Sequence, residues 1–396
     1  MIIIYMKYII LLIILILFLF FNYLNIYKNL KYEYFSSNGL KLIKSINITR
    51  KIYYPRIFQL KNNYYFSCRI SKNKNRSDIF SERIILYKID LNNLSINRLN
   101  KEYNFQRGAT HNIQFYNISD KLIGIGGRGY INKDNRVYKK VYNDFFINKN
   151  NFYYYNKNNQ KFFNYNNIDK ERIPHFIKPD VNCSFFSNGL YKFDIKDDID
   201  NLDNNYTYNK IITNLTQGRN DGYWGNNDGK NIKDGLTYFD SNNSLVYNIK
   251  NKKYYLYFRA NLAKGVRNIQ YSTSYDLLNW SSLKLIKLHN VQYKNILHIN
   301  IYINNFFYLK EVNKYIGLLS ITKPDSDHNI EKSFISLYIS DDCENWHFKK
   351  NIFSIYYPNE FLICGKPILY ENNYLFFIVD NTNLYIKVYK INKNIF

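Results

Sequence analysis

An acidic residue opens the most regular β pattern in this sequence. Asp240 precedes a short alternating run, a turn at 251–253, an aromatic run that ends in Arg259, and a third run that begins near Arg267. Four short antiparallel strands of this kind are the size of one blade of a β-propeller. The first strand of a blade lines the central cavity, so Asp240 is expected to point into that cavity. A carboxyl group placed there can transfer protons, which indicates a candidate sugar-processing enzyme.

Other polar residues also suit a cavity that binds carbohydrate. The guanidinium groups of Arg259 and Arg267 can clamp vicinal hydroxyls or a carboxylate, although Arg267 could equally bridge two blades. His111 and Asn112 open a second β pattern. The imidazole of His111 could donate to a substrate hydroxyl, or it could be a satisfied histidine at the end of a strand.

The same order of elements recurs five times, at about 51–100, 108–216, 236–290, 298–350 and 358–396. Each copy has a first strand, a turn rich in Asn, Lys or Asp, a strand rich in Tyr, Phe or Ile, and a strand that ends near a Ser/Asp turn. In the clearest turns, SYDLLNW and SDDCENW, the Ser and Asp side chains can bond the backbone while the indole packs between sheets. The sequence therefore predicts an all-β, five-bladed β-propeller.

Three segments lie outside this repeat. A strand at 39–49, within a linker at 28–50, could complete the fifth copy and close the ring. Residues 141–167 are rich in Asn, Tyr and Lys with little periodicity, and we interpret them as a low-complexity expansion. Residues 200–234 are expected to form long loops over the cavity mouth, with function concentrated at 221–235.

The first 27 residues are expected to form a membrane segment. Residues 8–21 are continuously apolar, and with their flanks they reach the ~20 residues that span a bilayer. No small-residue cleavage site follows, which favours an uncleaved signal anchor over a signal peptide or a buried core helix. We therefore expect a membrane-anchored protein whose propeller is lumenal or extracellular, or a secreted one if the segment is cleaved.

Charge and cysteine content limit the remaining classes. The net charge is +24, but the lysines are scattered among asparagines without a nucleic-acid-binding motif. This predicts no nucleic-acid partner, and the charge reflects either AT-rich codon bias or attraction to an anionic glycan or membrane. The cysteines lack metal-ligand spacing and could form up to two disulfides or remain buried thiols. No metal or cofactor is expected. The four cysteines are Cys68, Cys183, Cys343 and Cys364.

Several segments resemble a known family. FDSNNSLVYN, YYLYFRAN and GVRNIQYSTSYDLLNW, with the later SLYISDDCENW, resemble five-bladed propeller proteins related to glycoside hydrolase families 32 and 43. The resemblance covers roughly 50–396 and is strongest at 239–280. It implies cleavage of an oligo- or polysaccharide by two carboxyl groups at strand starts, one ionised and one protonated. Asp240 matches the acid that opens an innermost strand.

The other acids of the family pattern are not matched. Blade one opens with Tyr54-Pro55-Arg56 and blade two with His111-Asn112, so the second carboxyl group stays open. The candidates are Glu311, Glu360 and, in the loop ahead of Asp240, Asp221 or Asp234. Asp221 lies near Trp224, which offers a stacking surface for a sugar ring.

Two further alternatives follow from the missing acids. Asp240 could be a turn residue that bonds Ser241 and Asn242, in a non-catalytic propeller that binds glycan or protein. A transferase or phosphorylase on the same scaffold would need a basic anion pocket near Asp240. For the carbohydrate-processing alternative, the expected substrate-binding residues are His111, Asn112, Asn242, Arg259, Arg267 and Trp224.

Overall fold

The computed structural model describes residues 40–71, 82–105, 109–127, 145–148, 151–156, 161–164, 190–196, 199, 202, 206–212, 242–261, 267–290, 300–322, 333–355 and 361–396. Regular structure in these ranges is β-strand, apart from single turns of 3₁₀ helix. None of the described segments is a helix long and apolar enough to cross a membrane. The predicted anchor at 8–21 lies outside the described residues.

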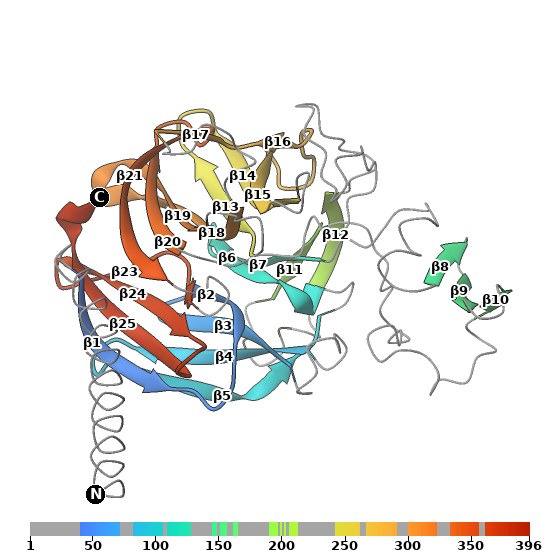
Figure 1. Cartoon of the computed structure of the whole chain (residues 1–396), viewed down its shortest axis with the longest axis horizontal. Coiled ribbons are helices and arrows are strands. Elements are labelled where there is room, and N and C mark those ends of the chain that lie inside the picture. The colour runs from blue at the N-terminus through green and yellow to red at the C-terminus, as the bar shows by residue number, and fades with distance from the viewer. Residues whose placement is uncertain are drawn as a thin grey trace, which may run out of the picture.

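Five antiparallel sheets are arranged around a common centre, which confirms the predicted five-bladed propeller (Figure 1). The first three sheets follow chain order from the centre outward, so that each inner strand comes first. Blade 1 contains β2 (Tyr53–Leu60), β3 (Asn63–Ser71), β4 (Glu82–Asp90) and β5 (Ser95–Tyr103). Blade 2 contains β6 (Gln114–Ile118), β7 (Lys121–Gly126), β11 (Leu190–Ile195) and β12 (Tyr206–Ile212). Blade 3 contains β13 (Ser244–Asn248), β14 (Lys253–Asn261), β15 (Arg267–Ser274) and β16 (Lys284–Leu285).

The last two blades depart slightly from this scheme. Blade 4 contains β18 (Asn300–Leu309), β19 (Lys314–Thr322), β20 (Ser333–Ser340) and β21 (Asn345–Ile355), with β17 (Lys287–His289) added in parallel to β21. Blade 5 contains β22 (Phe361–Ile363), β23 (Ile368–Tyr370), β24 (Asn373–Asp380) and β25 (Tyr385–Asn392). Its outer strand is β1 (Leu40–Asn47), in the stretch where the sequence predicts a spare strand. β1 pairs antiparallel with β25, and this pairing joins the two ends of the ring.

The aromatic doublets of the sequence arise because both faces of each sheet are buried. Successive residues of a strand point to opposite faces, so Tyr257 and Phe258 of β14 enter two different cores. Phe306 and Phe307 of β18 do the same. The buried apolar side chains form five clusters, one between each pair of neighbouring blades. A blade is therefore held by its neighbours on both sides.

The two Ser/Asp turns are built from the same hydrogen bonds. Asp276 Oδ1 accepts from the backbone N–H groups of Leu278 and Asn279 at 2.8 and 2.7 Å. Asp342 Oδ1 makes the equivalent pair with Glu344 and Asn345, both at 2.8 Å. The tryptophan that closes the second turn is fully buried and contacts aromatic rings of blades 3 and 4, namely Trp346 against Tyr257 and Phe306.

Two segments differ from the prediction, and the state of three cysteines is now defined. Residues 206–212, predicted to lie in long loops at 200–234, form β12, the outer strand of blade 2. Within 141–167, interpreted as low-complexity expansion, the structure has a separate three-stranded sheet of β8 (Phe145–Asn148), β9 (Asn151–Asn156) and β10 (Lys161–Asn164). Of the four cysteines, Cys68, Cys343 and Cys364 are buried free thiols, which is the second of the two states that the sequence left open. Burial raises the pKa of all three thiols. Cys183 lies outside the described residues.

Candidate functional site

The starts of the inner strands β2, β6 and β13 lie side by side at one end of the ring. Gln114 Nε2, at the start of β6, donates to the carbonyl oxygen of Tyr54 at 3.2 Å. Arg56 of β2 donates from Nη1 to the carbonyl oxygen of Asn243 at 3.1 Å. Asn243 Nδ2 donates in turn to the carbonyl oxygen of Asn112 at 3.4 Å. Three blades thus meet at one polar junction on the propeller axis.

Buried amide side chains line this junction and continue around the axis. Asn243 links blades 2 and 3, because its Nδ2 donates to the carbonyl oxygen of Ile125 at 2.9 Å and its Oδ1 accepts from the Tyr116 hydroxyl at 2.7 Å. Asn305 Nδ2 links blade 4 to blade 5 through the carbonyl oxygen of Ile363 at 3.1 Å. The amide residues at most 2% exposed in this region are Asn112, Gln114, Asn242, Asn243, Asn304 and Asn305.

Some of these amide atoms have no protein partner. Within the described part of the chain, Nδ2 and Oδ1 of Asn242, Oε1 of Gln114 and Oδ1 of Asn305 are buried without a hydrogen bond. An unmade hydrogen bond of a buried polar group costs about 1–3 kcal/mol, and native structures leave few such groups. An amide offers both donors and acceptors, as a sugar hydroxyl does. The set is therefore suited to a ligand with several hydroxyl groups.

A buried guanidinium adds positive charge to the same junction. Arg56 is 6% exposed, and its guanidinium carbon lies 4.3 Å from the centroid of the Tyr116 ring. Burial lowers the pKa of Arg56, and burial raises the pKa of Tyr116 to about 12. The start of blade 1 therefore carries a buried cation, with Arg56 in the Tyr54-Pro55-Arg56 segment.

A second buried group joins blade 1 to blade 2 at the same end. The Glu82 carboxylate, at the start of β4, accepts from Arg69 Nη1 at 2.9 Å and lies 2.9 Å from His111 Nδ1. The Glu82 and Arg69 side chains are only 5% and 12% exposed. The Arg69 guanidinium carbon lies 5.0 and 4.7 Å from the ring centroids of Tyr53 and Tyr54. Charge is balanced within this Glu82–Arg69–His111 cluster.

The cluster explains where His111 points. His111 belongs to the 3₁₀ turn η3 (Ala109–His111), and its Nε2 lies 3.1 Å from Arg69 Nη1. Arg69 Nη1 also lies 2.5 Å from His111 Nδ1, the ring nitrogen that contacts the Glu82 carboxylate. Both ring nitrogens are thus engaged by protein groups. His111 is buried, and its role as a donor to a substrate hydroxyl stays a prediction.

The predicted residues of blade 3 lie near this end. Tyr257 pairs with Ser244, the first residue of β13, so Arg259 lies two residues further toward Asn242 along β14. Arg259 is 5% exposed, and its carbonyl oxygen accepts from Gln270 Nε2 at 2.8 Å. Arg267 is the first residue of β15 and pairs with Asn261. Both arginines therefore share the end of the blade that holds Asn242.

Of the predicted catalytic acids, Glu311 belongs to the described residues and the others do not. Asp240, Asp221, Asp234, Glu360 and the predicted stacking residue Trp224 lie outside the described residues. Glu311 is exposed in η9 (Lys310–Val312), the turn between β18 and β19. This turn follows the last residue of β18, whereas Asn304, near the middle of β18, donates to the carbonyl oxygen of Asn242 at 3.4 Å. The structure therefore does not bring Glu311 to the polar junction.

Sequence inspection missed several buried residues of this region. Glu82 and Arg69 carry charge inside apolar strands, and such residues are seldom buried unless paired. Arg69 contacts Glu82, 13 positions away in the sequence, and His111, 42 positions away. The sequence alone could not show which of these groups meet. Asn243 and Asn305 could not be recognised as site residues in the sequence, because the chain is rich in asparagine. Among the described residues, no cluster of His, Cys, Asp and Glu could hold a metal ion.

Several solved structures resemble this protein in fold. No family model matches this sequence, and no curated protein does. A mannose phosphorylase from Leishmania mexicana superposes with a TM-score of 0.47 at 10% identity, over 93% of each chain. A β-xylosidase gives 0.46 at 8% identity, over 87% of this chain and 94% of the other. An N-acetylgalactosamine deacetylase from F. plautii gives 0.44 at 9% identity, over 89% and 92%. Their names state three different reactions, and none is assigned to this chain.

Proposed function

We propose that this protein is a carbohydrate-processing propeller, specifically a glycoside hydrolase related to families 32 and 43, in which Asp240 supplies one carboxyl group. The observation that carries the proposal is the set of buried amide atoms at the polar junction that have no partner among the described residues. Asp240 precedes Asn242, a member of that set, by two residues. Sugar hydrolysis uses a pair of carboxyl groups, and amides near one of them can bind the hydroxyl groups of the sugar.

The chemistry needs a second carboxyl group in the opposite protonation state. We propose Glu360 or Asp221 for this role, since Glu311 lies in the turn at the other end of its strand. A carboxylate within ~4–6 Å of a guanidinium is held ionised, and Arg56 is the described group on the axis that could do this. The partner acid would stay protonated away from Arg56 and would release the leaving oxygen.

The test uses the full-length chain purified in mild detergent and a panel of neutral and acidic aryl glycosides and oligosaccharides. Asp240→Asn should lower kcat/KM by about 10²–10⁴-fold, the usual contribution of a group that transfers protons. The control is Asp120→Asn, an exposed residue with a φ of 62° that asparagine tolerates. Turnover that survives Asp240→Asn would remove Asp240 from the mechanism. Asp221→Asn and Glu360→Gln then identify the second acid.

One observation favours a non-catalytic glycan-binding propeller as the second candidate. The two buried carboxylates described at this end are both neutralised, Glu82 by Arg69 and Asp380 by Lys387 at 2.8 Å. Asp380 also accepts from the backbone N–H groups of Thr382 and Asn383 at 3.1 Å. Glycan binding that is unchanged in Asp240→Asn, with no turnover by the wild type, would support this candidate over the hydrolase.

We also propose that residues 8–21 anchor the protein in a membrane, with the propeller on the lumenal or extracellular side. The support is the continuous apolar run in the sequence. Alkaline extraction of membranes tests it, because an anchored chain stays in the pellet. Protease protection of sealed vesicles then reports the side on which the propeller lies.

A further inference from the structure

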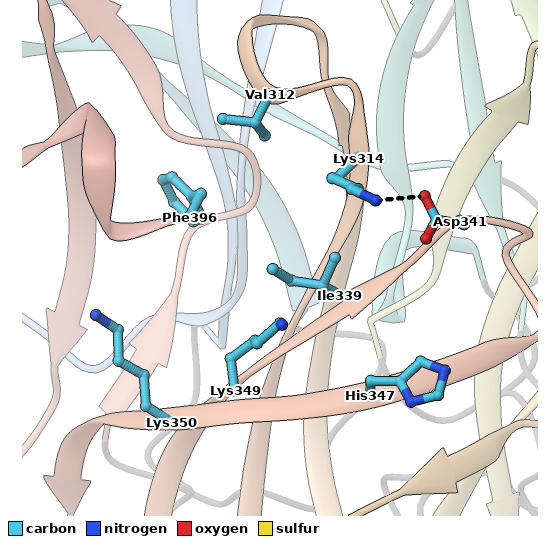
Figure 2. Close-up of a pocket in the computed structure, with 8 residues that line it drawn as sticks. All are labelled: Val312, Lys314, Ile339, Asp341, His347, Lys349, Lys350 and Phe396. Atoms are coloured by element: carbon cyan, nitrogen blue, oxygen red, sulfur yellow. Dashed lines mark hydrogen bonds and ion pairs between the residues drawn. The ribbon is translucent and has the colours of Figure 1, made fainter.

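A cavity lies away from the polar junction, on blade 4. It has a volume of about 530 Å³ and is lined by residues of β21, of the β18–β19 turn and of the C-terminus (Figure 2). Val312 and Lys314 at this turn follow the end of β18. Asn304, near the middle of β18, bonds the residue that precedes β13. The cavity therefore belongs to the end of blade 4 opposite the polar junction.

An irregularity in β21 directs two lysines into this cavity. Leu337 pairs with Lys350 and Tyr338 pairs with Phe348, so Lys349 is an extra residue in the β20–β21 pairing. In a regular strand, Lys349 and Lys350 would point to opposite faces. A β-bulge re-aims one side chain, and both lysines line the cavity on the side of Ile339 (Figure 2). Two ammonium groups are thereby concentrated at one wall.

Among the described residues, only one of the cavity lysines is paired with a carboxylate. Lys314 Nζ bonds Asp341 Oδ1 at 2.7 Å, and this hydrogen bond lowers the pKa of Asp341. Within the described part of the chain, Lys349 and Lys350 have no ion-pair partner. The side chains of the three lining lysines and of Asp341 together carry a net charge of +2. A single dianion would neutralise it.

We propose that this cavity binds the dianionic phosphate group of a phosphate monoester. Lysine ammonium groups bind phosphate as point charges. The remaining walls are apolar, from Val312, Ile339 and Phe396. These three side chains pack on the core between blades 4 and 5, and Phe396 is fixed there by Tyr374, with ring centroids 5.3 Å apart. The apolar walls can cover an uncharged remainder of the ligand, so the phosphate belongs either to a small soluble molecule or to a lipid headgroup.

Binding is measured by titration calorimetry on the full-length chain in a non-ionic detergent. The probes are inorganic phosphate, glycerol 3-phosphate and monomeric dihexanoyl phosphatidic acid, with sodium acetate as a carboxylate of lower charge. Phosphate probes should bind and acetate should not. Equal affinity for glycerol 3-phosphate and dihexanoyl phosphatidic acid identifies a soluble phosphate. A clear preference for the acylated probe identifies a lipid headgroup. Absence of binding by all three phosphates, or equal binding of acetate, overturns the proposal.

The variant that tests the residues is Lys349→Gln/Lys350→Gln. Because both ammonium groups would face a dianion, their removal should weaken phosphate binding by at least about 25-fold. The matched control is Lys88→Gln/Lys121→Gln, which removes two exposed lysines from blades 1 and 2. Melting temperatures show that both variants fold. Phosphate affinity that falls equally in both, or in neither, would also overturn the proposal. The outcome is independent of Asp240.

Discussion

Replacement of Glu82 by glutamine tests the energetic role of the Glu82–Arg69–His111 cluster. The change keeps the size of the side chain but removes the charge that neutralises Arg69, whose side chain is 12% exposed. Two unit charges about 4 Å apart interact by about 4 kcal/mol at the effective dielectric constant of a protein surface. Removal of one partner from a buried ion pair costs about 3–5 kcal/mol. We therefore expect Glu82→Gln to lower the free energy of unfolding by about 3–5 kcal/mol.

Blade 1 also supplies a matched exposed pair. Glu102 bonds Arg98 at 3.0 Å with side chains 24% and 37% exposed, and such pairs contribute about 0–1 kcal/mol. Urea unfolding monitored by tryptophan fluorescence compares Glu82→Gln with Glu102→Gln. Adding Arg69→Met to Glu82→Gln should cost less than the sum of the single changes, because no unpaired charge then remains buried. If Glu82→Gln costs no more than Glu102→Gln, the cluster does not stabilise blade 1 as described.

Three further predictions follow from other contacts. Gly126→Ala should destabilise the protein by several kcal/mol more than Gly124→Ala. The Cβ added at position 126 would lie 2.7 Å from the Ile113 backbone, whereas the Cβ added at position 124 would meet the movable tip of the Ile113 side chain. Equal melting temperatures of the two variants would contradict this. Asp276→Ala should lower the free energy of unfolding by about 1–2 kcal/mol at pH 7. Backbone N–H groups of Asn279 and Leu278 lower the pKa of Asp276, so this contribution is present above pH ~4 and shrinks as the pH falls below it. A loss of stability that is constant with pH would contradict the role of the carboxylate. Asn242→Leu should leave the free protein as stable as the wild type or slightly more stable, because it removes buried polar atoms that have no partner among the described residues. The same change should weaken glycan binding by about tenfold or more. A large loss of stability would show that the amide is satisfied in the free protein.

The propeller was predictable because its pattern is local and repeated. Doublets such as Tyr257-Phe258 and Phe306-Phe307 show that both faces of a strand are buried, and the Ser/Asp turn of blade 3 recurs in blade 4. The separate sheet of β8, β9 and β10 was not predicted, because its strands lie in a segment whose composition hides their periodicity.

The polar junction was predictable only in part. Asn242 and Arg259 were selected because they lie near Asp240 in the pattern of blade 3. Glu82, which meets His111 across 29 positions, was not selected, since long-range pairing of charges leaves no periodic signal. Arg56 was noticed only as a departure from the family pattern. Its burial on the axis beside Tyr116 depends on how blades 1, 2 and 3 pack.

The pairing of β1 with β25 joins a strand that is synthesised early to one that is synthesised last. β1 is the first described strand to be made, and its partner begins about 340 residues later. At the usual rate of about 5–20 residues per second, the hydrogen-bonding edge of β1 stays without this partner for about 17–70 s. An unpaired edge can template aggregation. Lys41 and Lys44 lie on this strand, and lysines on an edge strand discourage pairing with other chains until β25 is made.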